Sequence, residues 1–86
     1  MTKPTIHTNG THPKDLLEDQ MKAWRAVNEA VEALSKAGPN ARDYYVQHPD
    51  AFTEAQKEHR ARIGKLVEVA DELTELLDYL SDNQKD

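Results

Sequence analysis

The sequence contains no cysteine, only three glycines and four prolines, and five aromatic residues among 86. Without cysteine, disulfide bonds and thiolate metal sites are excluded. The scarcity of glycine and proline favours helices over a sheet protein with many turns. No apolar run approaches the roughly 20 residues that cross a membrane, and the polar N-terminal segment lacks the apolar stretch of a signal peptide. We therefore expect a cytoplasmic protein.

Charged residues make up 31% of the chain, and the formal net charge is −5. The acids concentrate near the C-terminus, where seven of them and one lysine lie between Glu68 and Asp86. Just before this segment lie four basic residues: Lys57, Arg60, Arg62 and Lys65. A net acidic chain argues against binding to duplex DNA, which needs a broad basic surface. We expect no nucleic-acid partner, although a local anion site is compatible with this charge distribution.

The apolar pattern predicts a first helix over residues 12–37, preceded by an extended arm of residues 1–10. Thr11 is expected to be the N-cap of this helix, with Pro13 in its first turn. Glycine and proline follow directly after the helix and are expected to end it.

A heptad seam predicts a second helix over residues 49–81, after a loop of residues 38–48. The apolar positions of this seam, together with one histidine, are 52, 59, 63, 66, 70, 73, 77 and 80. The predicted fold is all-α: an antiparallel helical hairpin over residues 11–82 with a coiled-coil-like seam, followed by a tail of residues 83–86.

The second helix is longer than the first, so we expect part of its apolar surface to lack a partner within the chain. An antiparallel register would place Leu34 near Phe52, Trp24 near Ile63 and Asn28 at the level of His59. The C-terminal leucines would then extend beyond the first helix. Small single domains bury little surface, and oligomerisation compensates for this. The predicted interface of a homo-oligomeric helical bundle consists of Ile6, Leu73, Leu76, Leu77 and Leu80.

The loop carries the densest group of chemically active side chains in the sequence. An arginine, a carboxylate and two tyrosines lie within residues 42–45. Arginine binds phosphate oxygens bidentately and tyrosine stacks on planar rings, so this set suits a nucleotide. The predicted ligand-binding residues are Arg42, Asp43, Tyr44, Tyr45, Lys57, His59, Arg60 and Asn28. The alternative is an ordinary loop in which Arg42 pairs with Asp43 and the two tyrosines close the hairpin core. For Asn28 and His59 the alternative role is a polar layer that sets the register.

No motif for catalysis or metal binding is found. The sequence has no HExxH motif and no serine in a nucleophile-elbow context. The four histidines lack the spacing of a metal site. We expect a non-enzymatic protein with no cofactor and no metal.

Two segments resemble a family of short phage and prophage helical proteins. The first is residues 6–11, Ile-His-Thr-Asn-Gly-Thr, and the second is residues 38–45, Gly-Pro-Asn-Ala-Arg-Asp-Tyr-Tyr, with Phe52 and the pair Glu58-His59 downstream. The family pattern reads approximately I-H-x-N-G-T, helix, G-R-D-Y-Y-P-Q, helix. This chain departs from it at Ala41, where glycine is usual, and at Val46, where proline is usual.

The resemblance implies a phage protein that acts in the host cytoplasm. The predicted function is a homo-oligomeric binding protein that sequesters a small phosphate-bearing ligand, a nucleotide, to counter host defence. The alternative is a structural or adaptor protein that binds a partner protein through its apolar helical stripe. Neither function involves a membrane.

Overall fold

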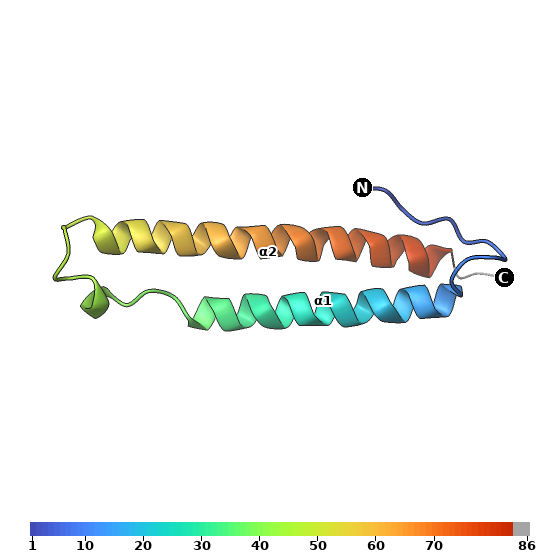
Figure 1. Cartoon of the computed structure of the whole chain (residues 1–86), viewed down its shortest axis with the longest axis horizontal. Coiled ribbons are helices and arrows are strands. Elements are labelled where there is room, and N and C mark those ends of the chain that lie inside the picture. Colours follow the sequence, from blue (N-terminus) through green and yellow to red (C-terminus); the bar gives the residue numbers. More distant parts are fainter. Residues whose placement is uncertain (84–86) are drawn as a thin grey trace.

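The computed structural model describes residues 1–83, which form two long α-helices and one short 3-10 turn. Helix α1 spans Pro13–Lys36, the turn η1 spans Ala41–Asp43, and helix α2 spans Ala51–Asp82. The two helices lie side by side and run in opposite directions, in a molecule that measures 62 × 19 × 18 Å (Figure 1). The prediction of an all-helical chain is confirmed. Of the predicted tail, only Asn83 lies among the described residues.

The N-cap of helix α1 lies one residue later than predicted. His12 is the N-cap, and its Nδ1 accepts a hydrogen bond from the backbone N–H of Lys14 at 3.1 Å. The prediction that Thr11 caps the helix is therefore wrong. Pro13 occupies the first turn, as expected for a residue that lacks an N–H there. At the other end, Lys36 lies 3.3 Å from Glu32, one turn earlier on the exposed surface.

The core of the helix pair is thin. Helix α1 contains no buried residue, and α2 contains only Ala51, His59, Ala70 and Leu80. The remaining apolar side chains between the helices are half-buried. A pair of helices buries only the stripe along which its members touch, so the flanks of that stripe remain open to solvent.

The register between the helices differs from the predicted one. The ring of His59 contacts the backbone carbonyl of Leu34, although Leu34 was expected seven residues earlier along α2. The indole of Trp24 donates to Thr74 Oγ1, eleven residues beyond its expected neighbour. The expected pairing of Asn28 with His59 is consequently wrong.

In the observed register, the part of α2 that extends beyond α1 lies at the loop end of the molecule, and not at the C-terminal end of α2 as predicted. There the first turns of α2 extend past the end of α1 and lie opposite the loop (Figure 1). The rings of Tyr44 and Phe52 pack with their centroids 6.2 Å apart, so the loop itself covers the start of α2. The C-terminal leucines of α2 do have partners within the chain. Leu80 is completely buried, and Leu77 lies beside Trp24 of α1.

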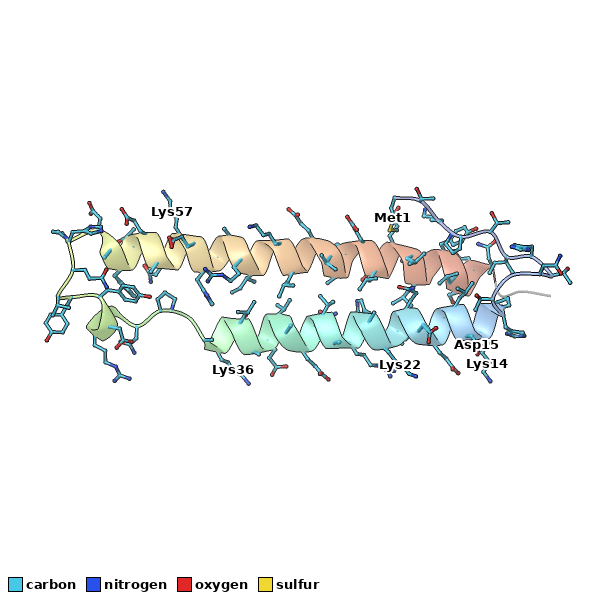
Figure 2. The ribbon with its side chains drawn as sticks, viewed as in Figure 1. Met1, Lys14, Asp15, Lys22, Lys36 and Lys57 are labelled. Carbon is cyan, nitrogen blue, oxygen red and sulfur yellow. The ribbon has the colours of Figure 1, made fainter. Side chains whose placement is uncertain are left out.

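The N-terminal arm folds back onto α2 of its own chain. Tyr79 Oη donates a hydrogen bond to the carbonyl of Pro4 at 2.8 Å. Lys3 lies 3.4 Å from Glu75, and its ammonium group lies 5.6 Å from the centre of the Tyr79 ring. Ile6 is half-buried. Figure 2 shows Met1 beyond α2, on the side that faces away from α1.

Candidate functional site

The loop end of the molecule contains a small recess of about 160 Å³. It lies between the end of α1, the loop and the first half of α2. Its lining residues are Ala37, Pro39, Tyr44, Ala55, Glu58, His59 and Arg62. Two residues of the predicted ligand site, Tyr44 and His59, are therefore brought together here.

His59 connects the two helices at the floor of this recess. Its Nε2 lies 2.6 Å from the carbonyl oxygen of Leu34. Because a carbonyl only accepts, Nε2 carries a proton, and in the neutral imidazole Nδ1 is then the acceptor. Arg62 Nη1 lies 3.4 Å from that Nδ1. The same carbonyl also accepts the backbone N–H of Ala37 at 3.0 Å, so His59 adds a second hydrogen bond, from the other helix, at the end of α1.

Arg62 is the residue that the sequence-based site left out. It lies one turn after His59 on the same side of α2 and lines the recess. Lys57 and Arg60, which were predicted to take part, do not line it. Spacing on a helix explains the difference: the lining residues Ala55, Glu58, His59 and Arg62 follow the i, i+3, i+4, i+7 pattern of one helix face, and positions 57 and 60 fall outside it. The i,i+3 pair of His59 and Arg62 was a signal that the sequence contained.

The remaining predicted ligand residues lie outside the recess. Arg42 and Asp43 belong to η1 and are exposed, and within the described residues no ion pair joins them. Tyr45 is 79% exposed. Asn28 lies on α1 and donates to the carbonyl of Trp24, one turn earlier on the same helix.

A second hollow, larger and mainly apolar, opens between the first half of α1 and the last turns of α2. This groove has a volume of about 420 Å³. Its lining residues are Leu17, Met21, Trp24, Thr74, Leu77, Asp78 and Ser81. The indole N–H of Trp24 donates to Thr74 Oγ1 at 3.0 Å, and Thr74 in turn donates to the carbonyl of Ala70. These hydrogen bonds hold the indole ring in place at the wall of the groove.

Similarity to known proteins does not assign either site. The chain matches no family model, and it has no significant similarity to a curated protein or to a solved structure. The resemblance to short phage proteins stays a prediction. Within residues 1–83, no three histidine or carboxylate side chains are grouped to hold a metal ion. In the same range, neither helix has the length and apolar character needed to span a bilayer.

Proposed function

We propose that this chain is a non-enzymatic, homo-oligomeric binding protein that captures a small phosphate-bearing ligand, a nucleotide, at the recess near the loop. The observation that supports this proposal is the grouping of Arg62, His59 and Tyr44 around one hollow. A guanidinium group binds two phosphate oxygens at once, and a tyrosine ring stacks on a base. Glu58 offers an acceptor for the hydroxyl or amino groups of a nucleoside.

The size of the recess supports binding between subunits rather than within one. Sites for small organic ligands have volumes of roughly 300–1,000 Å³, whereas this recess has about 160 Å³. A nucleotide therefore needs a further wall, and a second copy of the chain would supply it. The exposed Arg42 and Tyr45 lie on the adjoining loop and are available to such a shared pocket.

The accessible surface also favours self-association. The chain exposes 6625 Å², while a folded monomer of this mass exposes about 5,200 Å². The excess of about 1,400 Å² is larger than the roughly 800 Å² that each partner buries in a standard interface. A helix pair with no buried residue in α1 gains its missing core from a second copy.

The resemblance to phage proteins adds a biological setting to this proposal. A non-enzymatic oligomer that binds nucleotides with high affinity lowers their free concentration by mass action. Such a protein would counter a host defence that depends on a nucleotide signal.

The test is calorimetric titration of the purified oligomer with a panel of nucleotides. Arg62→Ala is expected to weaken binding of the best ligand about 10- to 150-fold, since hydrogen bonds to a charged group contribute roughly 1.5–3 kcal/mol. Lys65→Ala is the matched control, because it removes a positive charge from an exposed position of the same helix outside the recess. Equal losses for both variants would place the ligand elsewhere, and a wild-type protein that binds no nucleotide would overturn the proposal.

The apolar groove supports a second candidate, an adaptor that binds an amphipathic helix of another protein. Helix α1 contributes apolar residues one turn apart, Leu17, Met21 and Trp24, and α2 contributes Leu77, which together offer an apolar groove for such a helix. This candidate gains if millimolar nucleotides leave the melting temperature unchanged, since any ligand that binds the folded state raises it.

A further inference from the structure

One exposed strip of α2 has basic residues in its first half and acidic residues in its second half, so it is complementary in charge to an antiparallel copy of itself. Its members recur at alternating spacings of three and four residues, which keeps them on one side of a helix. This α2 strip consists of Lys57, Arg60, Gly64, Val67, Asp71, Thr74, Asp78 and Ser81. All eight residues are exposed, and the last three members also line the groove.

The order of the strip is basic, then apolar, then acidic. Its first half carries Lys57 and Arg60, its middle carries Val67, and its second half carries Asp71 and Asp78. None of these four charged side chains takes part in a salt bridge within the described residues. Two copies aligned antiparallel about Val67 would place each lysine level with the partner's Asp78, and each arginine between the two aspartates.

The middle of the strip suits close approach of a second helix. A Cβ built on Gly64 would meet no atom within 4 Å, so this position opens to solvent. Val67 is 40% exposed, although valine is usually an interior residue. Two apolar or small positions at the centre, with opposite charges on either side, are what a two-fold helix contact needs.

Helix α1 also carries opposite charges on either side of a central residue, on the same face of the molecule as the α2 strip. Its strip, which includes Met21 of the groove, consists of Glu18, Met21, Arg25, Asn28, Glu32 and Ser35. The contacts of Trp24 with Thr74 and of Leu34 with His59 place Asn28 between them, at about the level of Val67. Arg25 and Glu32 then lie on opposite sides of the same centre, so an antiparallel partner brings each arginine to the other copy's glutamate.

We infer that a second copy of this chain binds to this face in antiparallel orientation, with α2 against α2 about Val67, forming a two-fold symmetric four-helix unit. The inference rests on the self-association in the proposed function and adds the orientation of one contact. The recess lies on the other flank of α2, so its further wall would come from another copy of the chain. The second copy completes the groove, because its Lys57 and Arg60 lie above it. Their aliphatic stems cover Trp24 and Leu77 while their charged ends reach Asp78 and Asp71.

The charges select the orientation, and the apolar contacts supply the affinity. Exposed ion pairs contribute little to binding, but opposed like charges disfavour the wrong arrangement. In a parallel alignment the lysines and arginines of two copies would face each other, as would the aspartates. The antiparallel alignment is the one that avoids both clashes.

Charge reversal in one half of the α2 strip tests the orientation. Lys57→Glu/Arg60→Glu makes the whole strip acidic and is expected to raise the dimer Kd at least tenfold in sedimentation equilibrium, which corresponds to about 1.4 kcal/mol. Adding Asp71→Lys/Asp78→Lys reverses both halves and is expected to restore the wild-type Kd. Restoration by the second reversal is specific to an antiparallel contact. Acidic residues early in a helix and basic residues late in it suit the helix dipole, so the helix should persist.

The matched control changes the net charge equally without touching either strip. Lys22→Glu/Lys65→Glu has this property, and Figure 2 shows Lys22 pointing away from α2. If the reversed and control variants dimerise equally, the orientation is wrong while self-association stands. If the wild-type chain is monomeric at every concentration, both the orientation and the homo-oligomer are wrong.

Cross-linking gives a second, independent readout, and the chain is convenient for it because it has no native cysteine. A mixture of Lys57→Cys and Asp78→Cys chains is expected to yield the mixed dimer on treatment with a short bis-maleimide. Each variant alone is expected to remain uncross-linked. Cross-linking of each variant with itself, and no mixed product, would show a parallel contact and overturn the inference.

Discussion

Replacing Leu80 by alanine tests whether the C-terminal end of α2 packs within its own chain. Leu80 is the only side chain among the described residues that is completely buried. It belongs to the last turns of α2, and these turns lie beside the first turns of α1 (Figure 1). The register expected from the sequence would have left this leucine with no intrachain partner except the N-terminal arm, so the two registers predict different costs in the isolated monomer.

The expected cost is a large share of the total stability. Leucine-to-alanine changes at buried sites reduce the free energy of unfolding by about 2–5 kcal/mol. A single core in a chain of this size supplies roughly 3–5 kcal/mol. We therefore expect Leu80→Ala to be mostly unfolded at concentrations where the wild type is monomeric. Leu80→Met keeps the volume and is expected to remain folded with a loss below about 1.5 kcal/mol.

The assay is urea unfolding followed by circular dichroism over a wide range of protein concentrations. Val69→Ala serves as the control, because Val69 is 43% exposed and its truncation should change stability by no more than about 0.5 kcal/mol. If Leu80→Ala costs less than about 1 kcal/mol in the monomer and acts only on the oligomer, this leucine belongs to an interface between chains. The register described above would then be wrong.

Three further variants test the other contacts. His59→Ala removes the hydrogen bond that joins α2 to the Leu34 carbonyl and should lower the free energy of unfolding by about 0.5–1.5 kcal/mol in thermal melts. An unchanged midpoint would contradict this role. Gly64→Ala should stabilise the monomer by up to about 1 kcal/mol in urea titrations, because the position is helical and open to solvent. Destabilisation would show that the site is crowded. Tyr79→Phe removes the hydroxyl that binds the arm and should speed proteolysis within residues 1–10. The free energy of unfolding should change by about 1 kcal/mol or less. Equal cleavage rates would show that the arm is held by other contacts.

The helices could be predicted from the sequence because their signals are local. Heptad spacing of apolar residues and a proline in the first turn depend only on neighbours along the chain. Local signals did not decide which residue caps α1. Thr11 and His12 both carry an acceptor that can cap a helix, and the chain uses the imidazole of His12, which lies directly before Pro13.

The register could not be predicted because it depends on how the loop folds. A tight connection would have brought Phe52 opposite Leu34. The chain instead continues through an extended segment and η1 before α2 begins, and Tyr44 folds back onto Phe52. The seam positions of α2 can pair with α1 at several heptad offsets with similar apolar contact, so the packing of the loop decides among them.

The observed register gives the polar residues between the helices different contacts from those expected. In the expected register, His59 and Asn28 would form one polar layer. In the observed register, His59 binds a carbonyl at the end of α1 and brings Arg62 into the recess.

Asn28 is meanwhile placed at the centre of an exposed face. That face is where the charges of both helices become symmetric about one level, which they were not in the expected register. A single loop conformation therefore determines both where a ligand is expected to bind and how a second copy is expected to be oriented. The two proposals can be tested separately, because Arg62 and the α2 strip lie on different flanks of the same helix.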